Sequence, residues 1–535
     1  MAAIITSNFR TVNASHFKEQ IEGSSVYVGI GKSDVWSLTT SDTTDTTPFI
    51  PSDNLDQLGE ARANLIGLKK IISADIAHVV PRHTWTSGSS YFAWDSDDAS
   101  IFDKAFYIVT AEFKVYKCIK AGGGASSIQP TQTLTSPTAE SDGYTWKYMY
   151  TISVADAEKF LTNSYMPVKT VSLAATAVVA VNAASSATII LTETVPSIHI
   201  GMTVSGTNVG STKTVTAING SVLTLSSATA GTVSAASILT FAYANDAAAE
   251  AVLSEADYAQ YLNQKASRDS ATAAGIERIE VTAGGTGYTA NTGVAVAITG
   301  DGTGATVTTT SGITVAGGAV TAVTIANKGT NYRVVDLVIS GGAGSDATAR
   351  AVISPKAGHG IDPVSELGAF FVALNTKLDG NDGGDLTVGN DFRQITLINE
   401  PRVHNATPLA GNIATADTLK ATNYLDFNSS AVVANYTIDE LIVGAGGAQA
   451  YVVEKDTSAG YLRYHQNSKT GYKAFTNGEA VVGQSSAANY NLESSAAVGS
   501  PEVDRSSGEI LFLENRNPIS RTTTQIEDIK VIIEF

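Results

Sequence analysis

The chain has 535 residues, with 51 acidic against 34 basic side chains and a formal net charge of −17. This charge argues against a nucleic-acid binder, which normally carries a basic patch for phosphates, and against binding to anionic lipid. The one cysteine, Cys118, excludes an internal disulfide framework and a metal site built from cysteines. No stretch approaches the roughly 18 uninterrupted apolar residues of a membrane-spanning helix. The first residues lack the basic and apolar segments of a secretory signal.

Length suggests roughly three or four domains. Apolar residues make up 43% of the chain, enough for real cores, while charged residues make up 16%, below the usual level of about 25%. Glycine is abundant, and short Val, Ile and Thr runs alternate with turn residues. The composition predicts a mainly β, multi-domain protein with a few short helices, of the α+β class, in which β-sandwich-like modules are inserted into a discontinuous core domain.

The first block, residues 1–170, has the features of a principal globular domain. We expect strands near 26–30, 106–109, 113–119 and 144–150. We expect a short helix capped by Asn13 or Ser15, and a longer helix over 54–72. Large aromatics carry much of the burial in a core, and the block contains all four tryptophans: Trp36, Trp85, Trp94 and Trp146.

Residues 171–245 change in character. Between 171 and 240 the only charged residues are Glu193 and Lys213, and no aromatic residue occurs. Short β-branched runs separated by Gly and Ser predict a small β-sandwich-like module. The Ala-, Glu- and Gln-rich segment that follows, 246–275, predicts a connecting helix.

Residues 276–354 contain an internal repeat with a period of roughly 41 to 44 residues, in the range of stacked supersecondary units. Two such units would bury a shared core. The sequence Gly285-Thr286-Gly287-Tyr288 returns as Gly329-Thr330-Asn331-Tyr332, and Ile298-Thr299-Gly300 returns as Ile339-Ser340-Gly341.

The core domain is predicted to resume at 355–402. Asp362 should cap a helix that has Pro363 at its first position and runs to about Leu374. A further inserted β module is predicted at 403–502. The closing strands at 503–535 should contain a strand at 509–513 buried on both faces, a turn-like break at 515–518, and a strand with one apolar face formed by Ile529, Val531, Ile533 and Phe535.

Two glycine-rich segments resemble phosphate-binding loops only in part. Gly29-Ile30-Gly31-Lys32-Ser33 matches the end of a P-loop, but Val26 stands where its first glycine belongs. Leu441 to Gly446 resembles the start of a dinucleotide-binding turn, but position 449 is Gln and a strand is expected next instead of a helix. A strand with a tight turn is the better interpretation of both segments, so no cofactor-binding residue is assigned.

Acidic loops at Asp95–Asp98 and Asp379–Asp385 offer oxygen ligands but fit no EF-hand order, and a structural ion in the second loop is left open. A Gly-x-Ser-x-Gly motif is absent, and neither a nucleophile nor a general base is recognisable. The sequence therefore assigns no catalytic and no metal-binding residue. The seven histidines lie in no metal-helix motif and at no spacing typical of a catalytic triad: His16, His78, His83, His199, His359, His404 and His465.

Several landmarks, in one order and including both ends of the chain, resemble the baseplate wedge protein of T-even-type contractile-tailed bacteriophages, the product of their gene eight. The resemblance covers residues 3–168, about 355–402 and 503–535. The landmarks are Ala3 to Thr11 (AIITSNFRT), Gly31 to Trp36 (GKSDVW), Val80 to Trp85 (VPRHTW), Gly143 to Tyr148 (GYTWKY), Phe392 to Ile395 (FRQI), Ser507 to Ile510 (SGEI), Glu514 to Ile519 (ENRNPI) and Ile529 to Phe535.

This resemblance implies a non-enzymatic structural subunit of the virion tail baseplate, assembled in the host cytoplasm. It implies a homodimer that contacts other baseplate wedge proteins and takes part in rearrangement of the plate on infection, with no cofactor, nucleic acid, membrane or small-molecule substrate. The modules at 171–245, 276–354 and 403–502 look like additions to shorter family members. We expect them to be insertions at surface loops that project outward.

The alternative class is a glycan-binding or glycan-cleaving tail fibre or spike, because Gly- and Thr-rich β modules occur there too. Tyr461, Tyr464 and Tyr472 would then stack on sugars, whereas the competing expectation is that they pack within their own sheet. A third class, a soluble cytosolic enzyme, needs a site that the sequence does not show.

Overall fold

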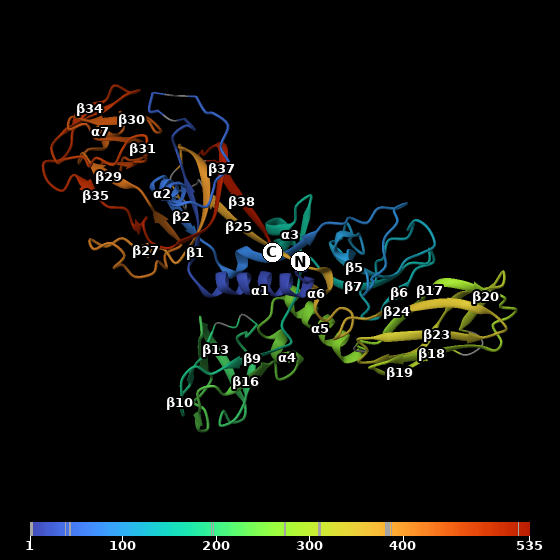
Figure 1. The fold of residues 1–535 in the computed structure, drawn as a ribbon. Coiled ribbons are helices and arrows are strands. Elements are labelled where there is room, and N and C mark those ends of the chain that lie inside the picture. The colour runs from blue at the N-terminus through green and yellow to red at the C-terminus, as the bar shows by residue number, and fades with distance from the viewer. Residues whose placement is uncertain are drawn as a thin grey trace. The chain divides into compact units, whose positions relative to one another are not determined.

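The computed structural model describes all residues except 1–3, 38, 42–43, 194, 196, 272–273, 309–311, 380–385, 387 and 523. The strand content of 40% against 13% helix confirms the predicted mainly β, multi-domain class. The chain divides into two compact units, which are described separately (Figure 1). Unit 1 comprises Met1–Phe17, Ala77–Val372 and Ile533–Phe535, and unit 2 comprises Lys18–Ile76 and Ala373–Ile532.

The centre of unit 1 is an aromatic sheet that follows the predicted strands closely. Its order is β4-β5-β7-β6, with Cys118 opposite Trp146. The largest fully buried side chains of the protein include Trp146, Tyr107 and Tyr150, so burial of aromatic area holds this sheet together. The strands are β4 (Tyr107–Val109), β5 (Lys114–Lys120), β6 (Thr138–Ala139) and β7 (Thr145–Thr151). In a separate sheet, β3 (Ile76–Pro81) pairs with β8 (Tyr165–Pro167).

Helix α1 (Ser7–Gly23) begins earlier than the predicted caps at Asn13 and Ser15. Its first half lies in unit 1, where Arg10 donates a hydrogen bond to the Phe535 carbonyl and pairs with Glu534 at 2.6 Å. The guanidinium of Arg10 also lies 4.2 Å from the ring centre of Phe370. These contacts fix the end of β38 (Ile526–Glu534) against the helix.

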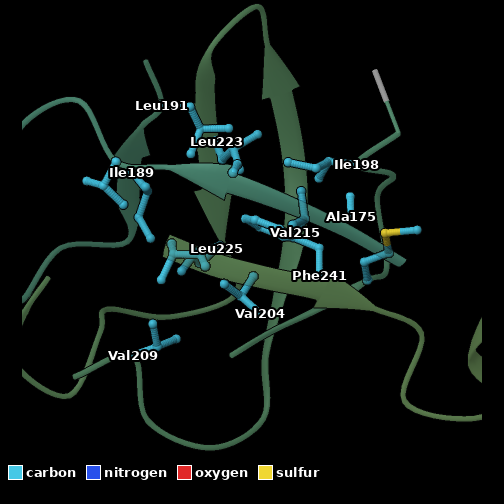
Figure 2. Close-up of a cluster of buried hydrophobic side chains, with 14 of the residues drawn as sticks. Ala175, Ile189, Leu191, Ile198, Val204, Val209, Val215, Leu223, Leu225 and Phe241 are labelled. Carbon is cyan, nitrogen blue, oxygen red and sulfur yellow. The ribbon is translucent and has the colours of Figure 1, made fainter. Parts of the chain in front are cut away.

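The module after residue 170 is a sheet with few charged side chains around an apolar core, which Ala249 and Tyr261 of the following segment complete. Figure 2 shows that Val204, Val215, Leu225 and Phe241 converge between its strands. Its sheet order is β11-β14-β13-β12-β16-β9, beside a β10-β15 pair. The strands are β9 (Ala174–Val178), β10 (Ala183–Ala184), β11 (Thr188–Ile190), β12 (Thr203–Ser205), β13 (Lys213–Asn219), β14 (Val222–Leu225), β15 (Thr232–Val233) and β16 (Ile238–Ala242).

The predicted connecting helix over 246–275 is wrong as a single element, because it is divided in two. Helix α4 (Asp246–Glu250) is followed by α5 (Glu255–Ser270). The first ends at its C-cap Ala251, and Ser254 caps the second, since its hydroxyl accepts a hydrogen bond from the backbone N–H of Asp257 at 3.2 Å. Serine at an N-cap competes effectively with helix continuation.

The two copies of the repeat pair with each other in reverse order. Strand β17 (Ile276–Thr286) pairs with β24 (Ser345–Ile353), β18 (Val294–Gly300) with β23 (Val335–Gly341), and β19 (Thr303–Val307) with β22 (Ile325–Thr330) (Figure 1). Tyr288 and Tyr332 enter the one apolar cluster that both copies form. The remaining strands are β20 (Ile313–Ala316) and β21 (Ala319–Val323).

The repeated glycines Gly285 and Gly329 have the same unusual backbone, with φ of 64° and 63°. A Cβ on Gly285 would lie 2.2 Å from the Ser345 carbonyl oxygen, and one on Gly329 would lie 2.5 Å from the Ala305 nitrogen. Only glycine tolerates both the left-handed conformation and this approach of the paired strand. The repeat in the sequence is therefore a repeat of strand geometry.

Helix α6 (Pro363–Leu367) begins as predicted, with Asp362 accepting a hydrogen bond from the Ser365 N–H at 3.1 Å. It ends seven residues before the predicted Leu374, because Gly368 adopts a left-handed conformation with φ of 69°. Strand β25 (Phe371–Asp379) follows.

Unit 2 is built around a five-stranded sheet with the order β28-β2-β1-β26-β37. The predicted helix over 54–72 is wrong after Ala63, because a buried apolar run, Leu65 to Leu68, forms a strand beside β1. The elements are β1 (Val26–Gly31), α2 (Leu55–Ala63), β2 (Leu65–Lys70), β26 (Asp391–Asn399), β28 (Thr418–Lys420) and β37 (Glu509–Ser520), with β27 (Arg402–Val403) and β36 (Val503–Asp504) forming a separate pair.

The closing strands differ from expectation in two ways. Residues 515–518 do not form a turn, because β37 continues through them. Its pairing with β26 shifts in register there, between Phe392 and Gln394. Residues 509–513 are not buried on both faces, since Leu511 is 42% exposed at the edge of the sheet. In β38 the predicted alternation holds at Ile529 and Val531, which are buried, whereas Ile533 is only partly buried, like its neighbour Ile532.

The region after residue 420 forms a seven-stranded sheet with the order β34-β33-β30-β31-β32-β29-β35. The β module predicted at 403–502 contains this sheet. Its apolar core includes Tyr436, Val452 and Leu462. The elements are β29 (Asn423–Asp426), α7 (Ser430–Val433), β30 (Leu441–Gly444), β31 (Gln449–Asp456), β32 (Tyr461–His465), β33 (Ala480–Gly483), β34 (Asn489–Asn491) and β35 (Val498–Gly499).

Candidate functional site

The P-loop-like segment belongs to a strand and leads into a buried ion cluster. Gly29 to Gly31 end β1, and no helix follows within the described residues 34–37. Lys32 has a left-handed backbone, with φ of 64°, and its amine pairs with Asp34 at 2.6 Å. A P-loop needs a helix N-terminus behind its glycines, so the geometry supports the strand-and-turn interpretation.

The cluster around Asp34 joins the end of β1 to the turn after β32. Lys469 reaches the same Asp34 oxygen as Lys32, at 2.5 Å, and the Asn467 amide donates to the other oxygen at 3.0 Å. Burial alone would raise the pKa of Asp34, but Lys32 and Lys469 outweigh it and hold the pKa below its ordinary value. His465 contacts the Ser33 hydroxyl at 2.9 Å, and burial lowers the pKa of His465 to about 4.

A second buried ion cluster lies in unit 1 around Glu366. One carboxylate oxygen accepts the backbone N–H groups of residues 360–362, and the other pairs with Lys117 at 3.0 Å. The Lys117 amine also lies 3.8 Å from the ring centre of Trp94. Burial opposes ionisation of Glu366, yet Lys117 and His359 lower its pKa to about 2. The cluster thus holds α6 against the aromatic sheet.

The same cluster extends into the repeat. His359 lies 3.7 Å from Glu366 and 3.6 Å from Glu277, and Glu277 pairs with Lys328 at 2.7 Å. Lys147 donates to the Ser267 hydroxyl at 3.0 Å, and burial lowers the pKa of Lys147 to about 8. Neither cluster was predicted from the sequence. The available signal was a lysine inside a strand of the aromatic sheet, at Lys117 and Lys147, because a buried amine needs a carboxylate or hydrogen-bonding partner.

The other sequence candidates do not converge. Leu441 to Gly446 forms β30 and the turn that leads into β31. A dinucleotide-binding turn needs a helix at the position where β31 stands. Asp95 pairs with both terminal nitrogens of Arg350, and Asp98 pairs with Lys104 at 2.5 Å. These two carboxylates of the acidic loop are therefore paired with basic side chains of the protein itself. Of the second acidic loop only Asp379 is described, and 380–385 lie outside the described residues.

The remaining histidines and the cysteine lie apart. His83 contacts the Tyr107 ring edge, His78 faces Ser15, and Cys118 is fully buried, with its pKa raised to about 12 by burial. Within the described part of the chain, no three His, Cys, Asp or Glu side chains are placed to hold a metal ion. In the same residues, no helix combines the length and apolarity needed to cross a membrane.

The three tyrosines proposed for sugar stacking occupy different environments. Tyr464 is 3% exposed and packs on Phe475. Tyr461 stacks on Tyr424 with ring centres 4.4 Å apart, and Tyr472 is 64% exposed. Two of the three therefore pack within their own sheet, and they form no common platform.

These observations define a class: a mainly β, multi-module protein with two buried ion clusters, around Asp34 and around Glu366. The family comes from comparison with known proteins. Residues 3–122 match the family model described as Gp8 of bacteriophage T4, a baseplate wedge protein. This match confirms the predicted resemblance to the gene-eight product family over less than a quarter of the chain, and it implies a structural protein of the phage tail baseplate. No match is found among curated proteins.

Proposed function

We propose that the chain is a structural subunit of a contractile-tail baseplate wedge that forms a homodimer and links other wedge proteins during assembly and rearrangement. The observation that carries this proposal is the family match over residues 3–122. Contacts exchanged during rearrangement need blocks that stay rigid while their interfaces change.

The buried ion clusters support such rigidity. In unit 1 the Glu366 cluster joins α6 to the aromatic sheet, and Glu277 and Lys328 extend it into the repeat. Removing one partner of a buried ion pair is strongly destabilising, so such clusters resist local opening. The rival function, a glycan adhesin on the three tyrosines, has less support because Tyr461 and Tyr464 pack inside their sheet.

The test is the mass of the purified chain in solution by light scattering, alone and with each purified wedge protein of the same phage. We expect a dimer that forms a stable complex with at least one wedge protein, with bovine serum albumin as an acidic control that does not bind. A monomer or trimer that binds none of them contradicts the proposal.

A further inference from the structure

A pocket of about 350 Å³ lies in unit 2, between the end of β1, helix α2 and the turn that contains Ser468. This volume is within the range of small-molecule sites. Its floor is made of side chains that are at most 6% exposed: Lys32, Trp36, Asn64 and Gln394. Exposed or partly exposed residues form its rim, among them Phe49, Asp56, Glu60 and Ser468.

Amide side chains along the floor form a directional chain of hydrogen bonds. The Asn467 amide donates to the Asn64 oxygen at 3.0 Å, and Asn64 donates to the Gln394 oxygen at 3.1 Å. Gln394 then donates to the Asn515 oxygen at 2.9 Å, and Asn515 donates to the Phe49 carbonyl at 3.0 Å. This relay fixes which end of each amide is the donor.

The relay leaves hydrogen-bonding capacity at Gln394 and Asn515, which line the pocket, whereas Asn64 is fully buried behind them. A side-chain amide has two donor hydrogens and an oxygen with two lone pairs. Among the contacts of the described residues, Asn64, Gln394 and Asn515 each use one of each in the relay. A hydroxyl group donates and accepts at once, so it matches such a surface better than a purely anionic or purely cationic group does.

The walls and charges favour the same kind of ligand. Trp36 and Phe49 stand edge to face, 5.4 Å apart, and the indole N–H of Trp36 is fixed by the Arg516 carbonyl at 2.7 Å. Aromatic faces suit the C–H face of a sugar ring. The amines of Lys32 and Lys469 both pair with Asp34, and Glu60 and Asp56 lie on the rim. A negatively charged ligand would meet two carboxylates at the entrance.

We propose that this pocket binds a neutral pyranose unit of a saccharide. The hydroxyls bond to Gln394 and Asn515, which Asn64 orients through the relay, and the ring packs against Trp36 and Phe49. The site differs from the tyrosines considered in the sequence, and it adds a binding activity to the proposed structural role.

The first experiment is saturation-transfer NMR on the full chain with D-glucose, D-galactose, L-rhamnose and N-acetyl-D-glucosamine, with D-glucuronate as the anionic comparison. We expect saturable binding of at least one neutral sugar, with a dissociation constant on the order of millimolar, and weaker binding of D-glucuronate. Phe49→Ala should weaken binding at least about tenfold. The matched control is Ile50→Ala, since Ile50 is the neighbouring residue, is 89% exposed and does not line this pocket.

A second variant keeps the test independent of Phe49. Ser468→Trp places a large ring at the exposed rim and should abolish binding while the urea midpoint of unfolding stays near that of the wild type. Retention on immobilised bacterial polysaccharide would identify a macromolecular glycan, and binding of the free sugar alone would identify a small ligand. The proposal is overturned if no neutral sugar binds saturably, or if both variants bind as the wild type does.

Discussion

The β9–β16 module and the β29–β35 module are both predicted as insertions, but they differ in how they join the chain. The first buries apolar side chains, including Leu223, Leu239 and Phe241, in a core that reaches only Ala249 and Tyr261 of the helices that follow it. The second sends Asn467 and Lys469 into the buried cluster of Asp34, and its Ser468 bonds to Glu60. Two segments that are both predicted as insertions therefore differ. Unit 1 does not need the first for its buried ion cluster, whereas the second supplies side chains to the buried Asp34 cluster of unit 2.

The largest expected effect comes from removing each segment in turn. Replacing 171–245 by a short Gly/Ser linker should leave a soluble protein with cooperative unfolding, because the Asp34 and Glu366 clusters remain intact. Replacing 403–502 should prevent folding of unit 2, because buried Asp34 loses Lys469 and Asn467, and Asn64 loses the hydrogen bond from Asn467. Gel filtration and circular dichroism distinguish these outcomes. Equal tolerance of the two deletions would contradict the comparison.

A single substitution tests the same dependence. Asp34→Asn removes the one carboxylate that Lys32 and Lys469 share, so it should destabilise unit 2 by about 3–5 kcal/mol. The measurement is the shift in urea midpoint at pH 7. The control Asp53→Asn changes an exposed carboxylate of unit 2 and should shift stability by no more than about 0.5 kcal/mol. Similar effects of the two variants would mean that the Asp34 cluster contributes little to the stability of unit 2.

Asp439 supplies a pH-dependent test of the second module. Its backbone is left-handed, with φ of 64°, its carboxylate accepts the Asp391 N–H at 3.0 Å, and burial raises its pKa to about 7. The unfolded value is about 3.9. The folded protein thus holds the proton more tightly, and this stabilisation is complete below about pH 4 and lost as pH rises through about 7.

Asp439→Asn is neutral at every pH, so it should raise the free energy of unfolding at pH 8.5 by an amount on the order of 2 kcal/mol and change it little at pH 4.5. Urea titrations at the two pH values measure the difference. Asp391 and Arg393 are the charged neighbours, and both remain in the variant. A gain of the same size at both pH values would exclude titration of Asp439 as the cause.

The smallest effect is expected in the β9–β16 module. The double variant Glu193→Gln and Lys213→Gln removes its two charges, and it should change the thermal midpoint by less than about 2 °C because neither charge lies in the apolar core. Differential scanning calorimetry measures this. A large loss of stability would mean that the module depends on charge as the other one does.

Patterns local in sequence predicted much of the fold. Alternating aromatics located β7, the strand expected near 113–119 is β5, and Asp362 with Pro363 located the start of α6. Propensity failed where tertiary burial decided the outcome: Leu65 to Leu68 continue a helical pattern but lie between two strands. Composition could not show that Ser254 would divide one helical segment into two.

The buried clusters and the amide pocket could not be predicted, because their members lie far apart in the chain. Asn467 is 433 residues from Asp34, and Lys117 is 249 residues from Glu366. Each residue alone is an ordinary polar side chain. Only the strand pairing of β1 with β2 and β26 brings Asn64, Gln394 and Lys32 to one place.

The reversed pairing of the repeat has a consequence for synthesis on the ribosome. Strand β17 is made first, yet its partner β24 is the last strand of the module. No half of the module can be completed while the other half is still in the exit tunnel, so unpaired edges persist until residue 353 has emerged. The duplication therefore makes folding of this module a single late event during translation.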